Sequence, residues 1–324
     1  MAKYRVLVTD FAWENLGIET AILETADAEI VNPRGKSESD LIEAASGCDA
    51  IMTNWARTTA AVIAAAKDCQ IVSRMGIGLD NIDVEFCTDC KIPVTNVPDY
   101  CVVEVAEHAL ALLMGMARKI AYYHLQTTAG GYDLQSGTTL KRICGQTLGI
   151  VGLGNIGQQF ARLAQGIGMK VIAYNRSQKV IEGVELVTFE ELLSRSDYVS
   201  LHTPLDETTQ CLVGKSEFAQ MKNTAFLINT ARGGLIDHGA LTQCLAQDGI
   251  AGAALDVQDP EPPDLSQAPY NDSRVIVTPH AAFVSQESLI ELRSRAATQV
   301  ADRLSGRLPA HIVNGVIEDR GKAL

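Results

Sequence analysis

Residues 147–157 read TLGIVGLGNIG, and this stretch decides the fold expected for the rest of the chain. It opens with a short apolar run of the kind found in buried strands, made of Leu148, Ile150 and Val151. Three glycines follow in the spacing G-x-G-x-x-G, namely Gly152, Gly154 and Gly157. Apolar residues then recur at helical spacing through residue 167. The stretch predicts a strand, a glycine turn and the start of a helix.

The glycines of such a turn have separate tasks. One makes the tight turn, one lets the backbone approach a pyrophosphate, and one lets the helix pack on the strand. The start of the helix offers unpaired N–H groups and a positive dipole end to phosphates. Residues 169–175, MKVIAYN, supply a second strand. We therefore expect dinucleotide binding, with contacts from Gly152, Gly154, Asn155, Ile156 and Gly157.

Length and composition set the broad class. The chain has 324 residues, which is room for two domains of ordinary size. Hydrophobic residues make up 47% and charged residues 20%, so the chain can bury cores. The net charge of −12 argues against nucleic-acid binding, which needs a basic face. A small anionic substrate stays compatible, because its site needs only one local positive charge.

The cysteines and the apolar segments indicate the compartment. The eight cysteines show no spacing of a disulfide framework. Cys87 and Cys90 form a C-x-x-C, but no second ligand pair stands at zinc-site spacing, so no metal is expected. Residues 1–8 are too short for a signal peptide, and the apolar helix at 109–117 is too short to span a membrane. We expect a cytoplasmic protein without a membrane partner.

The N-terminal part alternates between strand and helix patterns. Strands are expected at residues 4–9, 28–31, 49–53, 70–73 and 92–96. Helices are expected at residues 14–24, 39–45, 59–67 and 84–90. This order predicts an α/β fold with a parallel sheet and helices on both faces. The first strand ends in residues 9–11, TDF, without a glycine turn, so this part is expected to handle the substrate.

The remaining chain continues the pattern around the glycine turn. Residues 102–123 read as one long helix, apolar nearly all round, and residues 127–145 are polar. Further strands are expected at residues 198–202, 225–229, 253–257 and 275–278, with helices at 189–193, 215–221 and 238–247. An amphipathic helix at residues 285–304 has no strand of its own to join. It can return to the N-terminal domain and make that domain discontinuous.

Arg232 is the candidate cation for a substrate carboxylate. A nicotinamide enzyme acting on a 2-oxo or 2-hydroxy acid needs such a cation, an acid/base and a group that orients that base. Arg232 follows the expected strand at 225–229, at the carboxyl end where open α/β sheets bind ligands. Arginine is always charged and can hold a carboxylate through two parallel bonds. A surface arginine before a turn is the alternative.

His280 is the candidate acid/base, because it also follows a strand and its unperturbed pKa suits proton transfer near neutrality. His202 ends a strand at the expected cofactor edge and shapes a loop there. His108 is expected in the core. The other histidines are expected on the solvent side: His124, His238 and His311.

Glu261 is the candidate partner that orients His280. A carboxylate on the far ring nitrogen fixes the tautomer and stabilises the imidazolium. Asp259 and Asp264 are alternatives for this task, and spacing alone does not rank them.

Asn175 and Arg176 bear on the cofactor. An acidic residue about twenty positions after the glycine turn binds the ribose 2′-hydroxyl and repels a 2′-phosphate. The chain has neutral Asn175 there, followed by Arg176 and Ser177. We therefore expect NADP or NAD, with NADP favoured.

At these residues the chain resembles the D-isomer-specific 2-hydroxyacid dehydrogenase family. The resemblance rests on residues 76–83 (GIGLDNID), 152–157, 229–234 (NTARGG), Asp256 with residues 261–262, and residues 278–280. It implies two Rossmann-like domains, one of them discontinuous, and a homodimer formed through the cofactor domain. We expect a substrate domain of residues 1–100 plus 287–324, and a dinucleotide-binding domain of residues 101–286.

The resemblance also implies roles for individual residues. Arg232 would clamp the carboxylate, Glu261 would be the partner, and His280 would be the acid/base. Backbone N–H groups near Ile77 and Gly78 would hold the substrate carboxylate. Further cofactor contacts are expected from residues on the same sheet edge: Asn175, Arg176, His202, Thr203, Pro204, Thr208, Thr230, Ala231, Arg232, Asp256, His280 and Ala282.

Within the family, residues 97–104, 280–285 and 305–309 are similar to the branch of the C-terminal binding protein corepressors. That branch often has Trp where this chain has Phe283, and Asp at the position of Asn175. The substrate pocket is expected near Phe283 and the loop that carries Arg57. Arg57 is either a site for a second anionic group or a solvated loop residue.

The resulting hypothesis is an NAD(P)-dependent reductase of small 2-oxo acids that gives D-2-hydroxy acids. Glyoxylate, hydroxypyruvate, pyruvate and 3-phosphohydroxypyruvate are the candidate substrates. A dinucleotide-sensing, corepressor-like interaction protein is the alternative from another class. A dehydrogenase of an unusual acid, such as a phosphonate or a sugar acid, is the third possibility.

Overall fold

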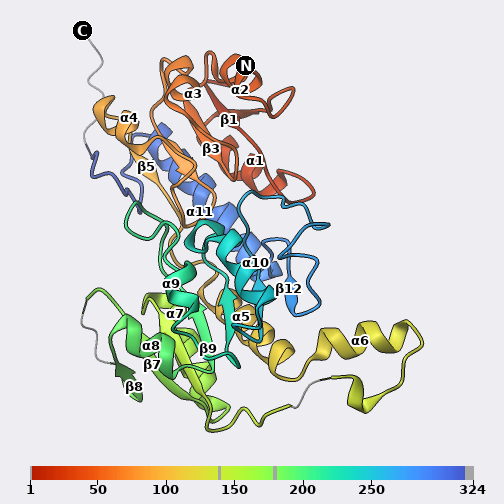
Figure 1. Ribbon diagram of the computed structural model, residues 1–324. Coiled ribbons are helices and arrows are strands. Elements are labelled where there is room, and N and C mark those ends of the chain that lie inside the picture. Colours follow the sequence, from red (N-terminus) through yellow and green to blue (C-terminus); the bar gives the residue numbers. More distant parts are fainter. Residues whose placement is uncertain (1, 138–139, 178–180, 318–324) are drawn as a thin grey trace. The chain divides into compact units, whose positions relative to one another are not determined.

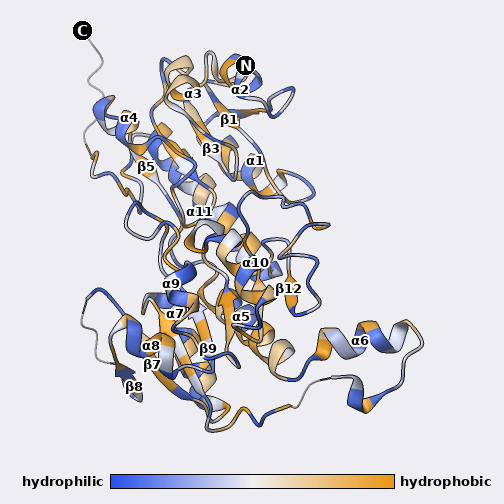
Figure 2. Cartoon of the chain, in the orientation of Figure 1, coloured by the Kyte–Doolittle hydropathy of each residue, from blue (hydrophilic) through white to orange (hydrophobic). Residues whose placement is uncertain are grey.

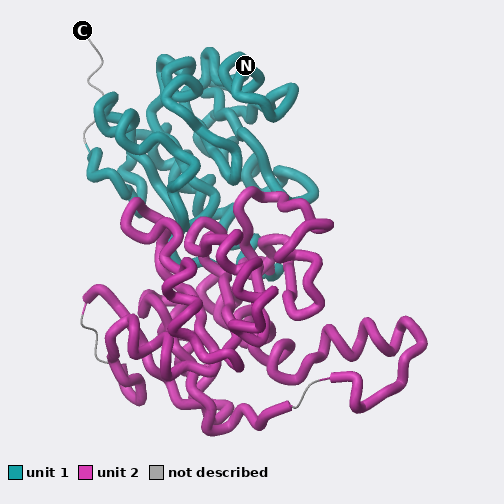
Figure 3. The backbone as a smooth tube through the Cα atoms, in the orientation of Figure 1, with its two compact units in different colours: residues 1–100, 285–324 teal, residues 101–284 magenta. Residues whose placement is uncertain are grey.

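The computed structural model describes residues 2–137, 140–177 and 181–317. The chain forms two compact units, shown in separate colours in Figure 3. The first consists of residues 1–100 and 285–324, and the second of residues 101–284. The end of the predicted 287–324 segment, residues 318–324, lies outside the described residues.

The first unit contains a five-stranded parallel sheet in the order β2-β1-β3-β4-β5 (Figure 1). Its strands are β1 (Tyr4–Val8), β2 (Ala28–Val31), β3 (Ala50–Thr53), β4 (Val72–Arg74) and β5 (Val94–Thr95). Its helices are α1 (Gly17–Glu24), α2 (Glu38–Ala45), α3 (Ala60–Ala65), α4 (Val84–Asp89) and α11 (Gln286–Leu304). The strand order reverses between β1 and β3, so the carboxyl ends of these strands border a topological switch point.

Helix α11 joins the C-terminal part of the chain to the first unit. It begins with a capping box at Ser285 and Ser288, and its buried face includes Leu292 and Val300. Arg293 donates to the buried carboxylate of Glu19 on α1 over 2.7 Å. The apolar stripe and this ion pair explain why a helix far along the chain packs on the N-terminal sheet.

The second unit contains a seven-stranded parallel sheet in the order β12-β11-β10-β9-β6-β7-β8. Its strands are β6 (Thr147–Val151), β7 (Lys170–Tyr174), β8 (Val184–Leu186), β9 (Tyr198–Leu201), β10 (Phe226–Asn229), β11 (Gly252–Leu255) and β12 (Val275–Val277). Its helices are α5 (Val102–Ala117), α6 (Ile120–Thr128), α7 (Asn155–Gly166), α8 (Phe189–Arg195), α9 (Lys215–Phe218) and α10 (His238–Ala246), with 3₁₀ turns η1 (Leu134–Ser136) and η2 (Gly233–Leu235).

Both faces of this sheet are covered. Side chains of α5 and α7 join one buried cluster, and side chains of α8 and α10 join another. The strands of both sheets are mostly hydrophobic in Figure 2, as expected for sheets covered on two sides. The predicted α/β fold with parallel sheets is confirmed. The order of the second sheet reverses between β6 and β9, which is the Rossmann switch point.

The structure corrects several predicted elements. The single helix expected at residues 102–123 is two helices, α5 and α6, separated at Lys119, which has a left-handed φ of 52°. The buried face ends at Ala117, and α6 has no buried residue, so packing does not hold the second segment in line. The edge strand β8 was missed because it is short and largely exposed. The first helix begins at Gly17 and not at residue 14.

Candidate active site

Packing explains two of the three glycines in the turn after β6. Gly152 has a φ of +99°, and a Cβ there would lie 2.6 Å from the carbonyl oxygen of His202. A Cβ on Gly157 would lie 2.2 Å from the carbonyl oxygen of Gly152. Gly154 differs, because its φ is −70° and a Cβ there would meet no atom within 4 Å. Among the described residues, nothing requires a glycine at position 154, whereas a ligand backed against the turn would.

His202 lies beside this turn, at the end of β9. Its Nε2 is 2.9 Å from the hydroxyl of Ser200, and its ring packs 5.4 Å from the ring of Phe160. Burial lowers the pKa of His202 to about 4, so the ring is neutral at physiological pH. His202 therefore supports the loop that continues into Thr203 and Pro204.

Asn175 ends β7 and faces the glycine turn. Its Oδ1 accepts from the backbone N–H of Leu153 over 2.9 Å. Its Nδ2 donates to the carbonyl and the hydroxyl of Ser177, over 2.6 and 2.9 Å. Arg176 and Ser177 are exposed. The turn thus presents a neutral amide and an accessible cation where an acidic residue would exclude a 2′-phosphate.

The turn after β10 positions Arg232. Asn229 accepts from the N–H of Ala231 over 3.0 Å and donates to the carbonyl of Arg232 over 2.8 Å. A Cβ on Gly233 would lie 2.1 Å from the backbone of Gln258, so this glycine lets the Arg232 turn pack against the loop after β11. The hydroxyl of Thr230 is buried and has no hydrogen-bond partner in the described part of the chain.

The loop after β11 provides Glu261, which bonds to His280. The distance from His280 Nδ1 to Glu261 Oε2 is 2.9 Å. Burial would raise the pKa of the Glu261 carboxyl, but the bond and charge of His280, the N–H of Gln258 and the charge of Arg232 together lower it. Glu261 therefore stays ionised at neutral pH and holds the imidazole ring from the Nδ1 side.

Asp256 fixes the backbone that carries His280. Its buried carboxylate accepts from the Thr278 hydroxyl over 2.6 Å and from the N–H groups of Ala281 and Ala282 over 2.9 and 3.0 Å. The N–H of His280 donates to the Asp256 carbonyl over 2.8 Å. His280 has a φ of +53°, a conformation that non-glycine residues adopt only when neighbours hold them there. The ring of Phe283 meets the His280 ring edge-on at 6.1 Å.

Three histidines lie elsewhere than predicted. The Nε2 of His108, on α5, is 3.1 Å from the Thr278 hydroxyl and 3.4 Å from the Asp256 carboxylate, so it belongs to the support of the His280 loop. Its helical apolar surroundings had indicated a core residue only. His238 was expected in solvent, but it is half-buried and bonds the carbonyl of Gly233 and the Tyr270 hydroxyl over 3.2 and 3.0 Å. His311 is also partly buried, 2.9 Å from Arg295.

In the first unit, the loop after β4 presents backbone N–H groups. The carbonyl of Gly76 accepts from the N–H of Val97 over 3.0 Å, and the carbonyl of Ile77 accepts from Asn96 Nδ2 over 2.8 Å. A trans peptide points its C=O and the following N–H in opposite directions. The N–H groups of Ile77 and Gly78 therefore point away from these partners, and neither has an acceptor among the described residues.

The other predicted residues occupy plain positions. Arg57 is exposed, and no ion pair joins it to a described residue. Thr208 donates from its N–H and hydroxyl to Asp206 over 2.8 and 2.6 Å, which shapes the loop after β9. The alternative His280 partners, Asp259 and Asp264, do not take that place, because Glu261 does.

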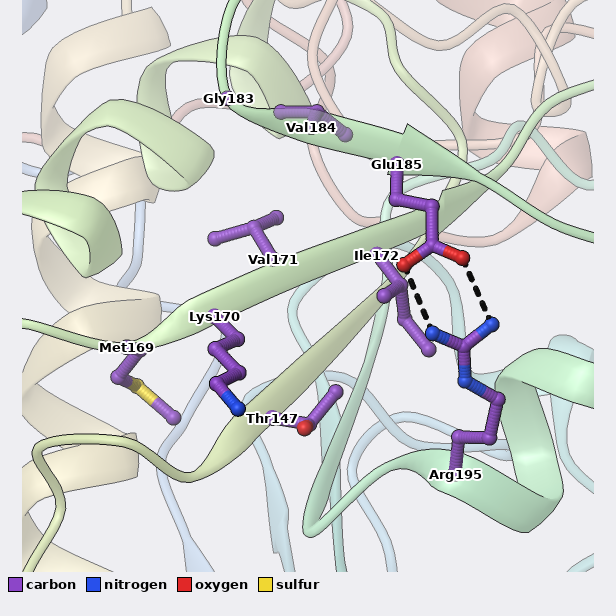
Figure 4. Close-up of a pocket in the computed structure, with 9 residues that line it drawn as sticks. All are labelled: Thr147, Met169, Lys170, Val171, Ile172, Gly183, Val184, Glu185 and Arg195. Atoms are coloured by element: carbon purple, nitrogen blue, oxygen red, sulfur yellow. Dashed lines mark hydrogen bonds and ion pairs between the residues drawn. The ribbon is translucent and has the colours of Figure 1, made fainter.

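A pocket of about 590 Å³ lies by the amino-terminal ends of strands in the second sheet, away from the carboxyl ends that carry the candidate active site (Figure 4). It is lined by the amino-terminal ends of β6 and β7, by β8 and by the end of α8. Its Arg195 and Glu185 bond each other through two contacts of 2.9 and 2.7 Å (Figure 4). The glycine turn follows the carboxyl end of β6, so this pocket is separate from the candidate active site.

No described helix combines the length and the apolar character needed to cross a bilayer. The described side chains also include no group of three or more His, Cys, Asp or Glu residues that could hold a metal ion.

A glycine turn at a Rossmann switch point, in the same parallel sheet as strands followed by a paired histidine and an arginine, is typical of a dinucleotide-binding oxidoreductase. Comparison with known proteins gives the family. The D-isomer specific 2-hydroxyacid dehydrogenase, NAD binding domain, matches residues 110–282. The chain belongs to the D-isomer specific 2-hydroxyacid dehydrogenase family, as its motifs predicted, and this is a family of NAD-dependent oxidoreductases.

Individual relatives align with this chain over most of its length. A glyoxylate reductase of Korarchaeum cryptofilum is 38% identical, with 86% of each chain covered. A D-3-phosphoglycerate dehydrogenase of Methanocaldococcus jannaschii is 35% identical over 96% of this chain, which spans only 59% of that protein. The crystal structure of the TT0316 protein from Thermus thermophilus aligns with a TM-score of 0.89 and 30% identity, covering 95% of this chain and 99% of that one. The corepressor-like alternative finds no support in these relatives.

Proposed function

We propose that this protein is an NAD(P)-dependent reductase that converts small 2-oxo acids into D-2-hydroxy acids. The observation that carries the proposal is the 2.9 Å bond between His280 and Glu261, on a loop packed against the Arg232 turn. This combination supplies an acid/base, its orienting carboxylate and a cation for a carboxylate.

Several residues fit a bound dinucleotide. The open space over Gly154, the first N–H groups of α7 and the unpartnered Thr230 hydroxyl suit a pyrophosphate and a polar ring substituent. Bound nicotinamide dinucleotide supplies the hydride. The residues proposed to hold it are the predicted ones: Gly152, Gly154, Asn155, Ile156, Gly157, Asn175, Arg176, His202, Thr203, Pro204, Thr208, Thr230, Ala231, Arg232, Asp256, His280 and Ala282.

The proton comes from His280. Glu261 bonds the ring at Nδ1, and Nε2 is the ring atom proposed to meet the substrate oxygen. In the reduction, protonated His280 gives the Nε2 proton to the oxygen that becomes the hydroxyl, and ionised Glu261 stabilises the imidazolium before that step. Asp256 keeps the loop of His280 in place.

The substrate carboxylate is proposed to bind Arg232 and the N–H groups of Ile77 and Gly78. These two N–H groups are available because the adjoining carbonyls bond inward to Val97 and Asn96. Phe283 would contact the substituent of the acid, which it approaches through its place beside the His280 ring. Arg57 has the exposure needed to meet a second anionic group.

NADP is the proposed preferred cofactor. Asn175 carries no charge that would repel a 2′-phosphate, and Arg176 and Ser177 next to it are exposed.

A homodimer is also proposed, through the segment from α6 to η1. Leu125, Tyr132 and Leu134 in this segment are 66%, 95% and 86% exposed, and a second copy of the chain would cover them. A reducing compartment such as the cytoplasm is also proposed, because the eight cysteines are not joined in disulfides.

Initial rates with NADH and NADPH against glyoxylate, pyruvate, hydroxypyruvate and 3-phosphohydroxypyruvate test the proposal. We expect turnover of at least one acid, with NADPH preferred, and the D-isomer as product on chiral chromatography. Dinucleotide binding without turnover of any 2-oxo acid would contradict the proposal and favour the alternative of a dinucleotide-sensing interaction protein. Light scattering of the purified protein tests the dimer.

A further inference from the structure

His238, the first residue of α10, forms a hydrogen bond through each of its ring nitrogens. Its Nε2 lies 3.2 Å from the carbonyl oxygen of Gly233, and its Nδ1 lies 3.0 Å from the hydroxyl of Tyr270. A carbonyl oxygen only accepts, so Nε2 carries the proton and donates to Gly233. Burial lowers the pKa of His238 below its usual value, so the ring is neutral at neutral pH. Nδ1 therefore accepts, and the Tyr270 hydroxyl donates to it.

Tyr270 lies in the loop after β11, the loop that also carries Glu261. Its ring packs against the buried cluster of the second unit, 5.7 Å from the His238 ring. Burial and the charge of Asp259 raise the pKa of the Tyr270 hydroxyl, and a hydrogen bond from the Asp259 backbone opposes this rise. Such a bond must be donated to the phenol oxygen, so its donor is the Asp259 N–H. His238 and Tyr270 thus form a hydrogen-bonded bridge from Gly233 to Asp259.

This bridge connects the two loops that carry the candidate catalytic groups of the second unit. Gly233 directly follows Arg232 in the turn after β10, and Asp259 shortly precedes Glu261 in the loop after β11. The two loops also touch directly, because a Cβ on Gly233 would lie 2.1 Å from the backbone of Gln258. Contact packing is not directional, whereas hydrogen bonds weaken steeply when their angles change. The bridge is therefore what fixes one loop against sliding along the other.

We propose that His238 and Tyr270 are positioning residues that set the placement of Arg232 relative to His280. The proposal rests on the proposed function, in which Arg232 holds the substrate carboxylate and His280 meets the 2-oxo oxygen. Glu261 transmits the position of its loop to His280 through their 2.9 Å bond. The carboxylate and the 2-oxo group of the substrate lie on adjacent carbons, so the substrate cannot absorb an error in this spacing. A misplacement of about 1 Å can cost about 100-fold in rate.

Tyr270→Phe and His238→Leu test the bridge in two ways. The first removes only a hydroxyl and keeps the ring in the buried cluster, and the second removes both bonds of the imidazole. With the best 2-oxo acid and dinucleotide of the wild type, we expect kcat to fall about ten-fold or more in each variant. The KM for the acid and the dinucleotide affinity should stay within about three-fold, because each loop keeps its own binding groups.

Three further variants separate positioning from general stabilisation. His238→Gln should recover most of the lost kcat, because its amide can donate to Gly233 and accept from Tyr270. The double variant of His238→Leu with Tyr270→Phe should be no slower than His238→Leu alone, because both changes remove the same connection. Tyr198→Phe is the matched control, since it removes a tyrosine hydroxyl of the same unit at the start of β9, and its kcat should be unchanged.

Wild-type kcat in folded Tyr270→Phe and His238→Leu proteins would overturn the inference. It would also be overturned if kcat fell only together with dinucleotide affinity and melting temperature and did not recover in His238→Gln, since that pattern reports loss of stability. A wild-type protein that reduces no 2-oxo acid would instead contradict the proposed function. The two failures are therefore distinguishable.

Discussion

Gly154→Ala and Gly152→Ala should distinguish the role of this turn in cofactor binding from its role in folding. At position 152 an alanine would need a φ of +99° and a Cβ 2.6 Å from the His202 carbonyl oxygen. A positive φ costs an alanine roughly 1–2 kcal/mol, and forcing an extra carbon into packed backbone costs roughly 1–3 kcal/mol. We expect Gly152→Ala to lower the free energy of unfolding by about 2–5 kcal/mol.

Gly154→Ala meets neither obstacle, because its φ is −70° and a Cβ has no neighbour within 4 Å. Alanine is a poorer N-cap than glycine, but it also reduces the entropy of the unfolded chain by about 0.4–1 kcal/mol in free energy. The free energy of unfolding should therefore change by less than about 1 kcal/mol. A dinucleotide pressed against this position would lose one charged hydrogen bond, worth about 1.5–3 kcal/mol, which is roughly a ten- to hundred-fold loss of affinity.

Urea unfolding of the cofactor-free protein and titration calorimetry with NADPH and NADH measure the two effects. Gly157→Ala serves as a further structural control, because its Cβ would lie 2.2 Å from the Gly152 carbonyl oxygen. Wild-type dinucleotide affinity in a fully folded Gly154→Ala protein would refute the assignment of this turn to the pyrophosphate.

Three further predictions concern histidine and asparagine side chains. His280→Ala should lose most of the turnover while dinucleotide affinity by calorimetry stays near wild type; full turnover would contradict its acid/base role. Asn175→Asp should reverse the ratio of kcat/KM for NADPH and NADH by about ten-fold or more, through repulsion of the 2′-phosphate; an unchanged ratio would show that this position does not set the preference. His202 has its folded pKa lowered to about 4, so the folded state binds a proton less readily than the unfolded chain and stability is lost as pH falls below the usual value of 6.5. This loss should reach about 2 kcal/mol by about pH 5 and be absent from His202→Gln in urea unfolding at both pH values; equal slopes would contradict the buried, neutral ring.

The G-x-G-x-x-G turn and the alternating strands were enough to predict the Rossmann fold. Apolar runs with period-2 and period-3.6 spacing report burial directly, and the glycine spacing reports a turn that other residues resist. The family motifs likewise implied catalytic roles for Arg232, Glu261 and His280. The structure shows Glu261 bonded to His280. Short elements at exposed edges, such as β8, left no such pattern.

The support of the site depended on contacts between residues far apart in the chain. His108 and Thr278 are separated by 170 positions in the chain, and only the packing of α5 on the second sheet brings them to 3.1 Å. The pairing of Asn54 with Arg74 depends in the same way on β3 and β4 lying side by side. The sequence by itself determined which elements form and which chemistry is available. The tertiary structure alone decided which polar atoms are satisfied, because hydrogen bonds in a buried site depend on angstrom-scale placement that no residue spacing encodes.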